Sequence, residues 1–149
     1  MEILKNQLKT WQANSVVFYS TAHGFHWNVE GPLFTQYHAF FEEIYSDVYT
    51  TIDTISEWLR KFNETAPYTL QDFMINNNYG DVQVESNSPI SMSRKLLDMN
   101  EKMISDIKMM FDEATLQKEQ GLANFLADRQ DKHEFWGWWL RSSLKSTIN

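Results

Sequence analysis

The sequence predicts an all-α protein, a four-helix bundle with a long crossover between its second and third helices. Three observations predict this fold. Apolar residues recur at helical spacing along most of the 149 residues, the chain has only five Gly and three Pro, and its turn-forming residues gather at positions 63–91. Few turns imply long elements, and a long connection allows helices two and three to run parallel. With 42% hydrophobic residues available for a core, we expect one domain over residues 1–149.

The first two helices are separated by a break at Gly31 and Pro32. We expect the first helix from about Glu2 to Val29 and the second from this break to about Phe62. The core stripe of the first helix consists of Leu4, Leu8, Trp11, Phe18, Ala22, Phe25 and Val29. The core face of the second helix consists of Phe34, Phe41, Val48, Ile52, Ile55 and Leu59.

The crossover at positions 63–91 contains most of the turn-forming residues of the chain. A connection of this length is expected to hold some structure of its own. The run Thr69-Leu70-Gln71-Asp72 predicts a short helix that is capped at its N-terminus. Val82 and Val84 alternate as in a strand, but they are too isolated to form a sheet.

The third long helix is expected from Ile90 or Ser91 to about Lys118, with Ser91 or Ser93 as its cap. Its expected inward residues are Leu97, Ile104, Ile107, Phe111 and Ala114. Four methionines also follow this helix, namely Met99, Met103, Met109 and Met110. We interpret them as gap-filling core or interface residues rather than as a soft-metal surface, because helical methionine stripes usually fill irregular space.

The fourth long helix is expected from Leu122, after a break at Gly121, to about Leu144. One of its sides carries Leu126, Trp136 and Leu140. The run Phe135-Trp136-Gly137-Trp138-Trp139 contains three tryptophans that cannot all face one core. Some of them should contact neighbouring subunits, since a monomer rarely leaves so much aromatic surface in water.

Two histidines and three carboxylates form the candidate site. The break between the first two helices places His26 at the end of the first helix and His38 about two turns into the second. On a wheel of about 100° per residue, Glu42, Asp53 and Glu57 all fall within about 100° of His38. Imidazole together with carboxylate is a suitable ligand set for a metal ion. The three carboxylates could instead form a general acid/base cluster, but the nearby histidines make metal ligation the simpler interpretation.

Distance along the second helix argues that one chain cannot complete this site. Fifteen residues separate His38 from Asp53, which corresponds to about 22 Å along the axis, whereas metal–ligand bonds are about 2 Å long. If a second copy of the helix packs antiparallel across a two-fold axis, His38 of one chain meets Asp53 and Glu57 of the other. Symmetry then produces two such sites. Helix geometry therefore predicts a dimer interface at the site.

The segment that carries these residues resembles the Dps family of mini-ferritins. The matching positions are His26-Trp27, Gly31, Phe34, His38, Asp53 and Glu57. The resemblance implies a ferritin-like bundle in which two histidines of one subunit, with the Asp and Glu of its two-fold partner, bind iron. It further implies ferroxidase activity, with peroxide or dioxygen as the oxidant, and storage of the ferric product in a hollow homo-oligomer of twelve subunits.

The resemblance also implies roles for residues around the site. His23 fits a position that supports the metal ligands without binding the metal, or a purely structural one. Trp27 either intercepts radicals near the metal or packs as an ordinary aromatic residue. On the last helix, Asp128, Asp131 and Glu134 lie where family members place a pore for iron, although an ordinary solvated helix face explains them equally well.

Two positions depart from the family pattern. Trp58 stands where an arginine usually follows the ligand Glu, and Glu42 stands where Asp is common. These changes bear on the affinity and turnover of the site more than on the fold.

Composition argues against several other classes of protein. The formal net charge is −7 and no block of Lys or Arg offsets it, so binding to DNA is not expected. A Dps-like structural or DNA-protecting shell with weak or lost ferroxidase activity is the alternative function. The chain has no Cys, no Gly-rich phosphate loop and no His-Glu-x-x-His zinc motif. It also lacks the ~20-residue apolar run of a membrane span and a signal peptide, so we expect a cytoplasmic protein.

Overall fold

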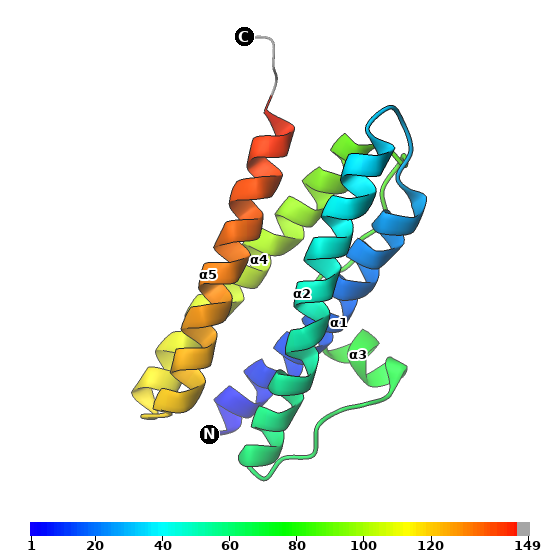
Figure 1. The fold of residues 1–149 in the computed structure, drawn as a ribbon. Coiled ribbons are helices and arrows are strands. Elements are labelled where there is room, and N and C mark those ends of the chain that lie inside the picture. Colours follow the sequence, from blue (N-terminus) through cyan, green and yellow to red (C-terminus); the bar gives the residue numbers. More distant parts are fainter. Residues whose placement is uncertain (146–149) are drawn as a thin grey trace.

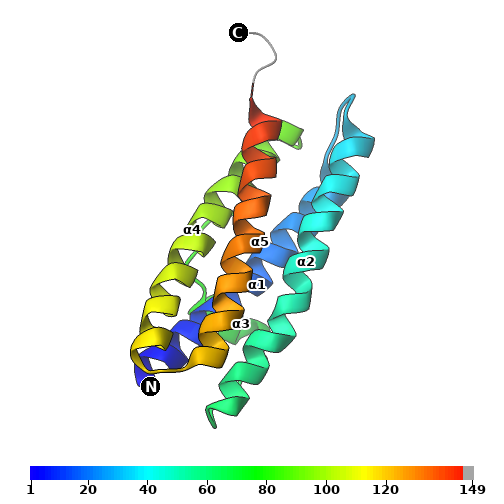
Figure 2. The same ribbon diagram turned by 60° about the vertical axis from the view of Figure 1, so that its left-hand side comes forward.

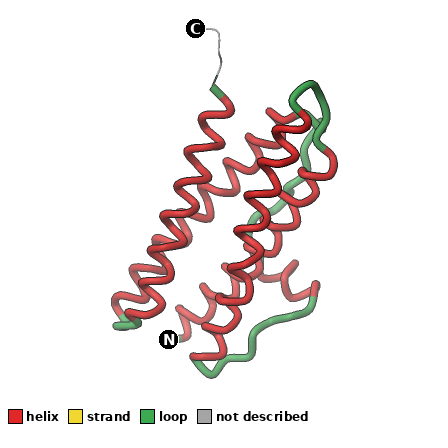
Figure 3. Tube along the Cα trace, in the orientation of Figure 1, coloured by secondary structure: helices red, strands yellow, loops and turns green. Residues whose placement is uncertain are grey.

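The computed structural model describes residues 1–145 and folds them into helices joined by loops, without strands in that range (Figure 3). The helices are α1 (Glu2–Asn28), α2 (Phe34–Lys61), α3 (Leu70–Asn76), α4 (Pro89–Leu116) and α5 (Gln120–Leu144). The four long helices form a bundle in which α1 and α2 make one antiparallel pair and α4 and α5 make the other (Figures 1 and 2). The expected all-α bundle is confirmed.

The crossover runs back along the bundle, so that α4 begins at the end where α2 also begins (Figure 1). Helices α2 and α4 are therefore parallel, as the long connection predicted. The short helix α3 lies in this crossover, and the Thr69 side chain caps it by accepting a hydrogen bond from the Asp72 backbone N–H at 3.0 Å. Val82 and Val84 are half-buried in irregular backbone.

The cap of α4 differs from the expectation. Ser88, rather than Ser91 or Ser93, accepts the capping hydrogen bond, from the Ser91 backbone N–H at 3.1 Å. Pro89 occupies the first helical position, where its fixed φ and missing N–H are tolerated, so the helix begins earlier than predicted. Ser93 is instead buried within the helix.

The core is built from all four long helices and agrees with the predicted stripe of α1, every residue of which is buried. On α2, Phe34 is 42% exposed because it is the first helical residue, and Ile52 is half-buried. On α4 the predicted stripe was partly wrong: Ile107 and Ala114 are buried, but Leu97, Ile104 and Phe111 only flank the core. Methionines explain the difference, since Met99, Met103 and Met110 fill the core, whereas Met109 is exposed.

A buried polar network joins α2 to α4 and α5. The two oxygens of Asp47 each accept a hydrogen bond of 2.9 Å from Arg129, and the Trp136 indole N–H donates to Asp47 at 2.7 Å. His133 lies 3.1 Å from Arg129 and 2.9 Å from the Asn100 side-chain oxygen. These contacts explain which of the three clustered tryptophans faces inward: Trp136 is 3% exposed and Trp138 is 57% exposed.

The contacts within this network determine whether Asp47 and His133 are charged. Burial opposes ionisation of Asp47, but hydrogen bonds and the positive charge of Arg129 outweigh it and lower the pKa of that carboxyl. Burial, together with the Arg129 charge, lowers the pKa of His133 to about 3. His133 is therefore neutral, with Nδ1–H donating to Asn100 and Nε2 accepting from Arg129. None of the helices in the described part of the chain is both long and apolar enough to span a membrane.

The neutral state of His133 predicts how stability depends on pH. An unfolded histidine titrates near ~6.5, so below that pH the unfolded chain binds one proton that the folded chain does not. This proton lowers the free energy of unfolding by about 1.4 kcal/mol per pH unit as the pH falls from ~6.5 towards 4.5. The free energy of unfolding, measured in urea at each pH, should change less steeply with pH for His133→Gln than for the wild type over this range. Equal slopes would mean that His133 is not held neutral by the fold.

Candidate metal centre

His26 and His38 meet where α1 ends and α2 begins. Their rings stack with centroids 3.7 Å apart and planes 18° apart. The Nδ1 of His26 lies 2.6 Å from the His38 carbonyl oxygen, and the Nδ1 of His38 lies 2.7 Å from the His26 carbonyl oxygen. A carbonyl oxygen only accepts, so each Nδ1 carries a proton and donates it. Each Nε2 then keeps its lone pair free for a metal ion.

The turn between α1 and α2 brings the two histidines together. Gly31 has a φ of +122°, in the region that favours glycine, and its carbonyl accepts from the Phe34 backbone N–H at 3.0 Å. The crossover holds this turn, because the Glu30 backbone N–H donates to the Asn87 carbonyl at 2.9 Å. The chain therefore reverses in a few residues, which places position 38 beside position 26.

The carboxylates lie on the exposed face of α2. Glu42 is one turn after His38, whereas Asp53 and Glu57 form a pair one turn apart farther along the helix, and all three are exposed. A hydrogen bond with Asp53 and the negative charge of Asp53 raise the pKa of Glu57. Two carboxylates held so close favour a cation between or beside them.

The histidine pair and the carboxylate pair do not meet within one chain. His38 and Asp53 are about 22 Å apart along the axis of α2. Within residues 1–145 no three His, Asp or Glu side chains lie close enough together to hold a metal ion. Each chain thus carries the histidine pair near the start of α2 and the carboxylate pair near its end.

An aromatic cluster borders the histidine pair. The ring of His23 stacks on Tyr45 with centroids 4.1 Å apart and packs against Trp27 at 4.3 Å. The Tyr19 hydroxyl lies 3.0 Å from the His23 Nδ1. Burial, followed by the charges of Glu42 and Tyr19, raises the pKa of Tyr45. Our sequence reasoning did not include Tyr19, although its four-residue spacing from His23, and that of His23 from Trp27, places all three on one face of α1.

Trp58, at the position that departs from the family pattern, packs against the far end of the bundle. Its ring lies beside Phe62, with centroids 5.7 Å apart, and the Lys61 ammonium sits 3.9 Å from the ring centroid. A Cβ on Gly121 would lie 3.0 Å from the edge of the indole. Trp58 therefore links the end of α2 to the start of α5. On α5 itself, the three acidic residues considered for a pore, Asp128, Asp131 and Glu134, are all exposed.

Comparisons with known proteins agree with this fold. A family model of the ferritin-like domain matches residues 5–147. The DNA protection during starvation protein 2 of Bacillus anthracis is 24% identical over 144 residues, which cover 97% of this chain and 95% of that protein. The chain therefore belongs to the ferritin-like family, as a mini-ferritin of the Dps type.

Two solved Dps structures show the same fold. That of Vibrio cholerae, described as a member of a broad superfamily of ferritin-like diiron-carboxylate proteins, has a TM-score of 0.92 and 26% identity, covering 97% of this chain and 90% of that one. That of Thermosynechococcus elongatus has a TM-score of 0.91 and 25% identity, covering 99% and 93%. The family expected from the sequence is confirmed, and with it the general role of iron storage and protection.

The repulsion between Asp53 and Glu57 predicts the behaviour of a neutral variant. Without metal, Glu57→Gln removes one of two neighbouring like charges, so the thermal midpoint of the metal-free protein should rise slightly. The matched change Glu43→Gln, at another exposed position of α2, should leave it unchanged. Differential scanning calorimetry after chelator treatment measures both. A lower midpoint for Glu57→Gln would show that this carboxylate stabilises the fold.

Proposed function

We propose that this protein is a ferroxidase that binds Fe(II) between two-fold-related subunits and stores the ferric product inside a hollow homo-oligomer of twelve. His26 and His38 of one subunit would bind the ion together with Asp53 and Glu57 of its two-fold partner, and Glu42 would add a further carboxylate. Fe(II) is the substrate, and peroxide or dioxygen is the oxidant.

One observation carries the proposal: the reciprocal hydrogen bonds of His26 and His38. They fix both rings in the same tautomer and leave both Nε2 lone pairs available, which is the arrangement that metal-binding histidines require. Two neutral imidazoles cannot balance the charge of a divalent ion. An opposing pair of carboxylates supplies that balance, and Asp53 with Glu57 is such a pair on the same exposed face.

The exposed surface beside α2 supports pairing of two chains. The crossover before α3 is tied to this side of the bundle, because Gln12 of α1 donates both to Ser56 of α2 at 2.8 Å and to the Pro67 carbonyl at 2.9 Å. The helix α3 and the residues before it expose large apolar side chains, namely Tyr68, Leu70, Met74 and Ile75. Apolar surface of this kind marks an interface between proteins.

The proposed reaction needs no resident cofactor, because the oxidant accepts all the electrons that Fe(II) loses. Two Fe(II) ions each lose one electron, and one peroxide molecule accepts both electrons as its O–O bond breaks. With dioxygen, four Fe(II) ions supply the four electrons. Hydrolysis of the ferric product releases protons to solvent. The exposed acidic residues Asp128, Asp131 and Glu134 are our proposed route for Fe(II) into the shell.

We do not propose that the shell coats DNA. The net charge of the chain is −7, and the two lysines near its N-terminus are already paired. Lys5 and Lys9 lie 3.6 and 3.3 Å from the carboxylate of Glu64. Protection of DNA by this protein would instead come from the removal of Fe(II) and peroxide.

Loss of the histidine pair should abolish rapid oxidation. We expect the double variant His26→Gly and His38→Ala to oxidise Fe(II) with peroxide no faster than the metal-only control, measured by ferric absorbance after anaerobic loading. The variant loses two side-chain hydrogen bonds, worth about 1 kcal/mol each, so the assembly should remain intact by size-exclusion chromatography. The control His23→Gln changes a nearby histidine that we place outside the metal ligands, and it should keep the rapid phase. Disassembly of the double variant would assign the histidines a mainly structural role.

Mixing two inactive variants tests the shared site directly. One variant lacks His26 and His38, and the other lacks Asp53 and Glu57. After the two are dissociated, mixed and reassembled, a mixed dimer contains one site with both halves intact and one with both halves mutated. Random pairing makes half of the dimers mixed, so activity should recover to about a quarter of the wild-type rate. If mixed assemblies, verified by mass spectrometry, recover no activity, then the ligands do not come from two subunits.

A further inference from the structure

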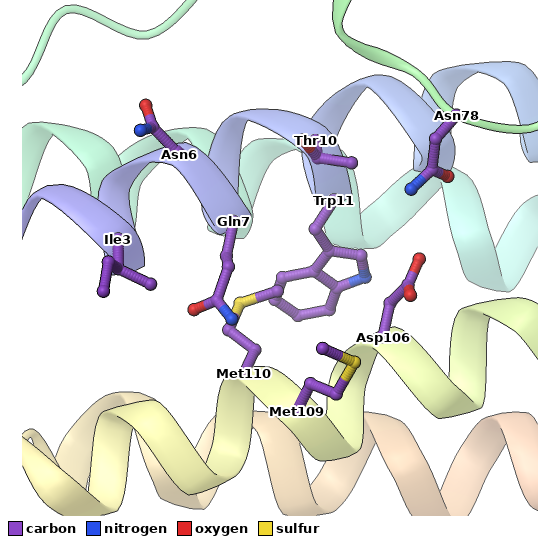
Figure 4. A pocket seen from close by; sticks show the side chains of 9 residues that line it. All are labelled: Ile3, Asn6, Gln7, Thr10, Trp11, Asn78, Asp106, Met109 and Met110. Carbon is purple, nitrogen blue, oxygen red and sulfur yellow. The ribbon is translucent and has the colours of Figure 1, made fainter.

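A groove of about 370 Å³ lies between the N-terminal half of α1 and the C-terminal half of α4, away from the residues proposed to bind iron (Figure 4). Its floor is the indole of Trp11, which packs against Phe125 of α5 with ring centroids 5.5 Å apart. Ile3 of α1 and Met109 of α4 add apolar walls. This volume is at the lower end of the ~300–1,000 Å³ range typical of small-molecule sites.

Three buried polar atoms around this groove have no hydrogen-bond partner in residues 1–145. They are the indole Nε1 of Trp11, the Oε1 of Gln7 and the Oδ2 of Asp106. Trp11 is only 2% exposed, and in Figure 4 its indole nitrogen and the Asp106 carboxylate face the same space. Buried polar groups are almost always paired, so these three atoms take their partners from water or from a ligand in the groove.

The groove is negatively charged. Asp106 is its one charged lining residue, and within the described chain no Lys, Arg or His lies within ion-pair distance of Asp106. Two of the three unpaired atoms, including the charged one, are acceptors, so the ligand must donate hydrogen bonds.

We propose that this groove binds a small organic ammonium ion with a short apolar body. The ammonium group donates to the Asp106 carboxylate, beside the Trp11 indole. The apolar body lies against Ile3, Met109 and Met110, whose flexible thioethers adapt to its shape. A carboxylate ligand would face Asp106 without any cation to receive it. A neutral alcohol would leave the charge of Asp106 uncompensated.

Isothermal titration of the assembled full-length protein tests this with three probes that share one apolar body. They are cyclohexylammonium, cyclohexanol and cyclohexanecarboxylate, each at pH 7 and low salt. We expect cyclohexylammonium to bind measurably, cyclohexanol at least about tenfold more weakly, and the carboxylate not at all. Asp106→Asn should weaken binding of the ammonium about tenfold or more. This variant loses no hydrogen bond within the chain, so it should fold.

Two further variants locate the binding. Asp98→Asn removes the same charge from an exposed position of α4 outside the groove, and it should bind cyclohexylammonium like the wild type. Met109→Trp fills the groove from an exposed position and should abolish binding. The proposal is overturned if cyclohexanol binds as tightly as the ammonium, if Asp98→Asn weakens binding as much as Asp106→Asn, or if no probe binds. Iron takes no part in these titrations, so their outcome is independent of the proposed ferroxidase activity.

Discussion

The half-buried carboxylate of Asp47 is the interaction on which the arrangement of the bundle depends. It stands on α2, faces the core, and receives hydrogen bonds from Arg129 and Trp136 of α5. Through His133 the same network reaches Asn100 of α4. A buried carboxylate without these partners would be strongly destabilising, so the two helix pairs are held in the register that satisfies it. Apolar packing alone would accept several neighbouring registers, because it is not directional.

The same constraint orients the candidate metal centre. Asp47 follows His38 by nine residues, which is about 180° around the helix, so anchoring Asp47 in the core directs His38 outwards. Glu42, Asp53 and Glu57 are likewise held on the exposed side of α2. The larger di-iron bundles bind their metal inside the core of one chain. Here a hydrogen-bonded network occupies that core, and the potential ligands lie on the surface, where we propose that a second subunit completes the site.

Two different uses of buried polar groups follow from this arrangement. In the Asp47 network most of the polar atoms are paired, so the network is structural and His133 stays neutral. Around the groove between α1 and α4, side-chain atoms of Trp11, Gln7 and Asp106 have no partner within residues 1–145. Leaving such groups unpaired costs free energy, which is why we propose this groove as a binding site.

The helices, most of the core and the candidate ligands could be predicted from the amino-acid sequence alone. Helical periodicity defined the stripe of α1, and the break at Gly31 with the spacing to His38 indicated the histidine pair, because these are local properties of the chain. Only the tertiary structure decided which side of α4 faces inward, since Leu97 and Met99 are both suitable core residues and the choice depends on the neighbouring helices. The reciprocal hydrogen bonds of His26 and His38, the network of Asp47 and the groove lined by Trp11 could not be predicted from the sequence either. Each of them joins residues on different helices, and helix periodicity specifies a face but not the atoms that will meet it.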